Sequence, residues 1–125
     1  MIIGIGIDIV KIARLEAAME RNSKAFLQRV YTPAEIVEAQ GRLEYLSGRW
    51  AAKEAAAKAL GCGIGGECSF TDIEISDAPE GAPSLKCTAP IAERLAERYS
   101  DLRWHVSISH ERDYAVAMVI LEGGI

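Results

Sequence analysis

The first ten residues constrain the fold more than any other segment. Isoleucine recurs at every second position from Ile3 to Ile9, and this alternation predicts a β-strand over residues 2–10. Gly4 and Gly6 lie inside the predicted strand, where glycine permits the close approach of another backbone or of a ligand. We therefore expect an N-terminal strand against which something packs very closely.

Asp8 interrupts this apolar run near its end. A carboxylate without a partner among isoleucines carries a severe desolvation cost. Two kinds of partner fit the residues about equally well: a hydrogen bond in a turn at the strand end, or a metal ion.

The second informative segment is rich in alanine and runs from Arg49 to Gly61. It predicts a long helix over residues 43–60, because glycine suits a helix C-terminus. Glu54 and Lys58 are four residues apart and share one face of that helix, so they could simply form an exposed ion pair worth about 0.2–0.5 kcal/mol. Alternatively, Glu54 joins Asp8 as a hard oxygen ligand of Mg²⁺, and Lys58 meets a substrate phosphate beside the metal.

The remaining pattern alternates helices with short strands. Thr32, Pro33 and Glu35 form a capping-box signature that marks a helix start. The other predicted elements are a helix over 12–21 that is interrupted at Asn22 and followed by a turn around Phe26, strands over 70–75, 84–88, 103–109 and 114–121, and a helix over 90–99. The predicted fold class is α+β, with a mostly antiparallel sheet packed with a long central helix and shorter helices, in a single domain of residues 1–125.

Composition excludes several function classes. The formal net charge of −4 argues against generic nucleic-acid binding, which requires a basic face. The three cysteines form no Cys-x-x-Cys pair, so a zinc knuckle or a secreted disulfide framework is not expected. The N-terminal apolar run is too short to span a membrane and lacks a basic leader, so we expect a cytoplasmic protein with no membrane association.

Residues 9–32 carry five basic side chains against two acidic ones, an excess of +3 in an otherwise acidic chain. Arg14 and Arg21 are two helical turns apart and could project from one face toward an acidic protein partner. Phe26 and Arg29 could extend that surface. The alternative is an amphipathic helix whose charges are only solvated.

Three short motifs occur in order along nearly the whole chain. They are Gly-Ile-Asp at 6–8, Trp-Ala-Ala-Lys-Glu-Ala-x-x-Lys-Ala-Leu-Gly at 50–61, and Ser-Ile-Ser-His at 107–110. In this combination the chain resembles the holo-acyl-carrier-protein synthases, which are small phosphopantetheinyl transferases. One departure is Cys62, where the family commonly has threonine.

The resemblance implies transfer of 4′-phosphopantetheine from coenzyme A to a serine of an acyl carrier protein, with release of adenosine 3′,5′-bisphosphate, in support of fatty acid synthesis. It also implies that Asp8 and Glu54 hold Mg²⁺ and that Lys58 neutralises the donor pyrophosphate. A homotrimer with active sites at subunit interfaces is expected as well.

Other roles stay open at this point. His110 either binds the nucleotide end or assists the chemistry, and Arg49 and Lys53 are weaker candidates for nucleotide phosphates. The proton of the acceptor serine could pass to Glu54, to a metal-bound water or to another carboxylate such as Glu35. A magnesium-dependent nucleotide hydrolase and a noncatalytic module that binds an acidic protein are the two competing interpretations.

Overall fold

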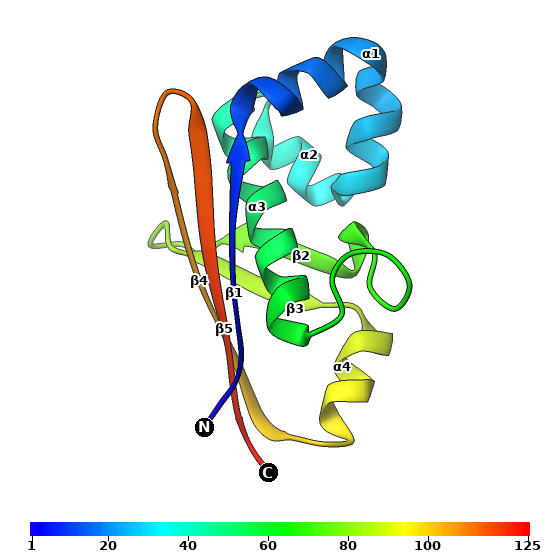
Figure 1. Ribbon diagram of the computed structural model, residues 1–125, viewed down its shortest axis with the longest axis vertical. Helices are drawn as coiled ribbons and strands as arrows, with labels where there is room; N and C mark the ends of the chain where they lie inside the picture. The colour runs from blue at the N-terminus through cyan, green and yellow to red at the C-terminus, as the bar shows by residue number, and fades with distance from the viewer.

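A computed structural model describes all residues from Met1 to Ile125 and has the predicted α+β fold class. Figure 1 shows the elements in chain order. They are β1 (Ile2–Lys11), α1 (Ile12–Val30), α2 (Pro33–Ala39), α3 (Leu43–Leu60), the 3₁₀ turn η1 (Phe70–Asp72), β2 (Ile73–Asp77), β3 (Pro83–Cys87), α4 (Ala89–Ala96), β4 (Ser100–His110) and β5 (Tyr114–Gly124). No helix combines the length and apolar character that crossing a bilayer requires.

The antiparallel strands form two sheets. One has three strands in the order β1-β5-β4, so that β1 and β4 are its edges, and the other is the β2-β3 pair. In Figure 1 the helices lie to the right of the three-stranded sheet and none covers its left face. One face of this sheet therefore packs on the core and the other is bare.

Helix α3 approaches β1 so closely that only glycine fits beneath it. A Cβ atom at Gly6 would lie 1.8 Å from the carbonyl oxygen of Ala55, and one at Gly4 would lie 1.8 Å from that of Ala59. This arrangement confirms the expected close approach and identifies the approaching backbone. Because side chains alternate along a strand, Asp8 points toward α3 like the two glycines.

Helix α1 bends at Asn22, which confirms the predicted interruption. Asn22 leaves the helical region at φ −163°, and its Oδ1 accepts a hydrogen bond from the N–H of Ala25 at 3.2 Å. The chain then resumes a helix, so Phe26 lies in that helix and not in a turn. Its side chain is 6% exposed and packs edge-on against Trp50, with ring centroids 5.4 Å apart. The prediction that Phe26 extends a docking surface is therefore wrong, because this ring belongs to the core.

The strand predicted from residue 70 begins at Ile73 instead. Residues Phe70–Asp72 form η1, because Ser69 and Asp72 make a reciprocal capping box there. The predicted capping box of α2 is confirmed: the Thr32 hydroxyl accepts from the N–H of Glu35, and a Glu35 oxygen accepts from the N–H of Thr32. Helix α3 ends at Gly61, as predicted, with φ +83°.

Candidate active site

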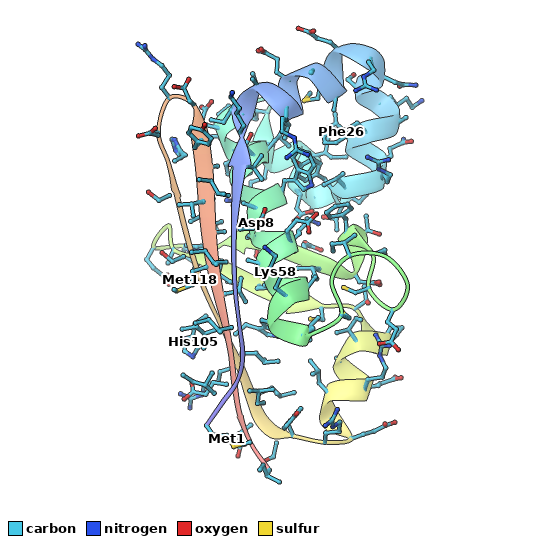
Figure 2. All side chains as sticks on the ribbon, viewed as in Figure 1. Met1, Asp8, Phe26, Lys58, His105 and Met118 are labelled. Atoms are coloured by element: carbon cyan, nitrogen blue, oxygen red, sulfur yellow. The ribbon has the colours of Figure 1, made fainter.

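Asp8 and Lys58 form one side of the candidate site. Asp8 lies opposite Ala117 within the β1-β5 ladder, so it is not in a turn at the strand end. Nζ of Lys58 donates to Asp8 Oδ1 at 3.3 Å and to the carbonyl oxygen of Ile7 at 2.9 Å. In Figure 2 the two labelled side chains lie next to each other beside β1. Lys58 is thus paired with Asp8, and the alternative ion pair between Lys58 and Glu54 does not form.

Glu54 has no hydrogen bond or ion pair with any other side chain, although it is half-buried. Burial raises the pKa of Glu54, and the nearby Asp8 carboxylate raises it further, while Lys58 and Arg14 lower it. Asp8 and Glu54 are thus close enough for their charges to interact, and no side chain forms an ion pair with Glu54. A divalent cation would supply the missing charge.

The donor set of Asp8 and Glu54 suits Mg²⁺. This ion is commonly held by one or two carboxylates, with water and substrate phosphate in the remaining positions. No group of three His, Cys, Asp or Glu side chains converges anywhere in the structure, so the chain lacks the closed ligand set of a structural zinc site.

Lys53 and Glu35 form a buried ion pair on another side of α3, with Nζ and Oε1 2.7 Å apart. Their exposed fractions are 0% and 1%. The lysine also donates to two backbone carbonyls, and the carboxylate accepts from two backbone N–H groups; the partners are Phe70, Ile73, Thr32 and Ile75. Burial lowers the pKa of Lys53, and Glu35 opposes that shift.

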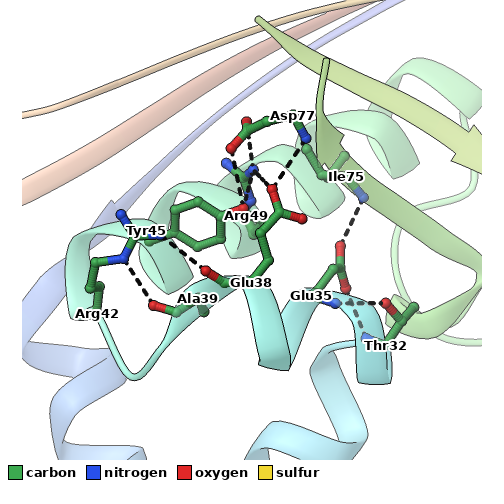
Figure 3. A network of polar contacts seen from close by, with 9 residues as sticks. All are labelled: Thr32, Glu35, Glu38, Ala39, Arg42, Tyr45, Arg49, Ile75 and Asp77. Atoms are coloured by element: carbon green, nitrogen blue, oxygen red, sulfur yellow. Dashed lines mark hydrogen bonds and ion pairs between the residues drawn. The ribbon is translucent and has the colours of Figure 1, made fainter. Parts of the chain in front are cut away.

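This network corrects two predictions. Lys53 is enclosed and uses its donors inside the chain, so it does not meet a nucleotide phosphate. Glu35 is likewise enclosed, and Figure 3 shows its carboxylate directed at Thr32 and Ile75. It is therefore not placed to accept the proton of an acceptor serine.

Arg49 lies in a second polar network, shown in Figure 3. Its guanidinium donates to Asp77 Oδ1 at 2.8 Å and to the hydroxyl of Tyr45, and it stacks on the Tyr45 ring with Cζ 3.6 Å from the centroid. Although burial acts in the opposite direction, Arg49 holds the pKa of Asp77 below its ordinary value. Only a small part of the Arg49 side chain reaches the surface. A phosphate bound there would have to share the guanidinium group with the Asp77 carboxylate.

His110 lies in the wall of the same surface cavity as Arg49. The cavity has a volume of about 350 Å³, and its other lining residues include Arg42, Tyr45, Gly81 and Pro83. Sequence reasoning missed these four residues as site candidates. No local signal singles them out, since they come from the N-terminal end of α3, including its N-cap, and from the turn and first residue at the start of β3.

The predicted site residues fall into two groups. Asp8 belongs to β1 at one edge of the sheet, and His110 belongs to β4 at the other edge, with β5 between them. Helix α3 crosses above the sheet: Gly48 near its start meets Ile108 of β4, and Ala55 further along meets Gly6 of β1. The structure thus joins Asp8, Glu54 and Lys58 at the β1 edge, and His110 and Arg49 at the β4 edge.

The basic residues Arg14, Arg21 and Arg29 are exposed on α1. Cζ of Arg14 lies 6.0 Å from the centroid of the Trp50 ring, and its charge acts on Glu54. Because α1 follows β1 directly, the start of this basic surface is beside the two carboxylates.

Comparison with known proteins gives a consistent identity. Residues 4–119 match the model of the 4′-phosphopantetheinyl transferase superfamily. The holo-[acyl-carrier-protein] synthase of Oceanobacillus iheyensis is 46% identical, with 98% of each chain covered. The crystal structure of the Neisseria meningitidis enzyme of that name has a TM-score of 0.88 at 39% identity, covering 98% of this chain and 99% of that one. The Helicobacter pylori enzyme in complex with coenzyme A has a TM-score of 0.85 at 39% identity, covering 94% and 99%. The chain therefore belongs to the 4′-phosphopantetheinyl transferase superfamily and, within it, to the holo-acyl-carrier-protein synthases.

Proposed function

We propose that this enzyme transfers 4′-phosphopantetheine from coenzyme A to a serine of an apo acyl carrier protein in a magnesium-dependent reaction. Adenosine 3′,5′-bisphosphate leaves, and the holo carrier protein serves fatty acid synthesis in the cytoplasm. The single observation that carries the proposal is the pair of electrostatically interacting carboxylates, Asp8 and Glu54, with Lys58 paired to Asp8.

Asp8 and Glu54 would hold Mg²⁺ in this reaction. When bound, the ion supplies positive charge to the oxygens of the donor pyrophosphate. Lys58 is half-exposed, and Asp8 and the Ile7 carbonyl take two of its three donors, so the remaining donor can turn to a phosphate oxygen. Fixed positive groups of this kind stabilise the charge that develops during phosphoryl-group transfer. Glu54 would also accept the proton of the serine, because burial and Asp8 raise its pKa and make it a better base.

The nucleotide end of coenzyme A would bind in the cavity lined by Arg49 and His110. That cavity is at the opposite sheet edge from Asp8. We propose that the β1 edge of one protomer meets the β4 edge of the next, so that each active site is shared between two subunits. A heterologous contact of this kind forms a ring when the rotation between subunits closes, and the resemblance to the family favours a trimer.

The bare face of the sheet supports assembly. Ile5, Ile7 and Ile9 project from it with exposed fractions of 58%, 57% and 62%. Figure 2 shows Met118 and His105 on the same side, away from the helices. A row of exposed isoleucines on a sheet face is typical of an interaction surface.

The carrier protein would dock on α1 through Arg14, Arg21 and Arg29. Their charge suits an acidic partner, and Arg14 lies close enough to Glu54 to influence it electrostatically. A carrier protein held there would present its serine near the pyrophosphate.

The test is intact-mass measurement of apo acyl carrier protein after incubation with this enzyme, coenzyme A and Mg²⁺. We expect a mass increase of one phosphopantetheinyl group, which requires Asp8. Cleavage of coenzyme A without any mass increase would instead identify a hydrolase. Binding of the carrier protein with coenzyme A left intact would identify a noncatalytic module.

A further inference from the structure

The buried pair of Glu35 and Lys53 has no role in the steps proposed above. It is nevertheless the most enclosed pair of opposite charges in the chain, with exposed fractions of 1% and 0%. Every donor of the Lys53 ammonium has a partner: one Glu35 oxygen and the carbonyl oxygens of Phe70 and Ile73 at 2.9 and 2.6 Å. Lys53 also directly precedes Glu54 in α3.

Two sets of contacts fix α3 from different sides. The glycines of β1 set how closely the helix approaches the strand, but a contact between backbones without side chains does little to prevent rotation of the helix about its axis. Arg49 and Lys58 of α3 also bond to β2 and β1, but Lys53 is the most enclosed restraint on that rotation, because its three hydrogen bonds have fixed directions and end on α2, η1 and β2.

A small rotation of α3 would matter for metal binding. The end of a side chain lies roughly 6 Å from the helix axis, so a rotation of about 20° moves a carboxylate by about 2 Å. Mg²⁺ demands near-ideal octahedral geometry with ligands at about 2.0–2.1 Å. A displacement of that size would separate Glu54 from a cation that is also held by Asp8.

We propose that Glu35 and Lys53 are positioning residues that fix the rotation of α3 and thereby aim the Glu54 carboxylate at the metal shared with Asp8. Neither residue contacts metal or substrate. The inference rests on the proposed function, in which Asp8 and Glu54 bind the divalent cation.

The direction of the change in cation affinity distinguishes lost positioning from a direct effect of the Lys53 charge. Removal of the Lys53 ammonium, considered as charge alone, makes the surroundings of Glu54 more negative and should tighten cation binding. Loss of positioning should weaken it. A fall in cation affinity after removal of a neighbouring positive charge therefore reports geometry.

The experiment measures Mn²⁺ binding by electron paramagnetic resonance in the absence of substrates, with Mn²⁺ standing in for Mg²⁺. The variants are Lys53→Met and Glu35→Gln, and Ile75→Val is the matched control, since it trims the same core without removing a polar group. Thermal melting identifies a temperature at which every sample is folded. Both positioning variants and the control should melt earlier than the wild type.

We expect Lys53→Met and Glu35→Gln to bind Mn²⁺ at least tenfold more weakly, the scale found when groups that orient metal ligands are removed. Ile75→Val should bind as the wild type does. Wild-type affinity in the folded variants would overturn the proposal and leave the pair a merely structural one. If Lys53→Met does not fold, the double variant Glu35→Gln/Lys53→Met, which removes one charge of each sign, decides by the same criterion. Asp8→Asn tests the premise separately: if it leaves Mn²⁺ binding unchanged, the metal assignment itself fails.

Discussion

Two inactive variants of this enzyme should restore activity to each other when their subunits are mixed. Asp8→Asn disables the group at the β1 edge, and His110→Asp places a carboxylate where a nucleotide phosphate would bind at the β4 edge. Because β5 separates these edges within one protomer, a shared site takes one group from each of two neighbours. A mixed ring then contains sites in which both contributing edges are intact.

The size of the recovery follows from random assembly. In a 1:1 mixture, half of the protomers carry an intact β1 edge and half carry an intact β4 edge. The chance that a given site combines the two is about one quarter, whatever the number of subunits in a closed head-to-tail ring. We therefore expect about 25% of wild-type activity per site.

The assay is the rate of carrier-protein modification after the two variants are unfolded together and refolded, with wild type refolded in parallel. Asp8→Asn mixed with Glu54→Gln is the matched control: both changes disable the same edge, so their mixture should stay inactive. Activity of the first mixture that does not exceed the sum of its separately refolded components would refute the shared site.

Four further outcomes are expected. Glu54→Gln should lower turnover roughly 10²-fold or more. Because burial and Asp8 raise the folded-state pKa of Glu54, its charged form opposes folding above its ordinary titration range, so this variant should melt at a higher temperature than the wild type at pH 7 without metal. An unchanged or lower melting temperature would contradict this reasoning. Lys58→Met should lower the free energy of unfolding by only a few tenths of a kcal/mol, since its ion pair is half-exposed. The single-turnover rate of carrier-protein modification should nevertheless collapse. An unchanged rate would show that Lys58 only pairs with Asp8 at the surface. Arg21→Glu should raise the Michaelis constant for the carrier protein and weaken its salt dependence without changing that for coenzyme A, and unaltered carrier-protein kinetics would move the docking surface elsewhere. Ile7→Asp should give monomers by light scattering, and a persistent trimer would exclude the bare sheet face as the contact.

The sequence predicted the features that depend on local pattern. The alternating run predicted β1, Gly61 predicted the end of α3, and Thr32 predicted the start of α2, because each signal operates within a few residues. Gly4 and Gly6 predicted a close approach correctly. The prediction that Asp8 and Glu54 belong to one site depended on recognising three motifs together.

The failures concern burial and partners distant in the chain. Glu35 looked like an ordinary capping residue, but its second oxygen accepts from Ile75, forty residues further on. Lys53 was predicted as a weaker candidate for a nucleotide phosphate, because nothing local shows that η1 and β2 cover it. Phe26 was placed in a turn, whereas packing against Trp50 holds it in the core. Such contacts arise only when the whole chain has folded.

The isoleucines on the bare face of the sheet have a consequence for regulation in the cell. If assembly through that face completes each active site, catalytic output follows mass action and does not scale simply with the amount of chain. At low expression, newly made subunits would remain apart and inactive, and output would then rise more steeply than expression. The concentration of the subunit would thus set the threshold above which activity appears, and no separate regulatory domain or effector would be needed.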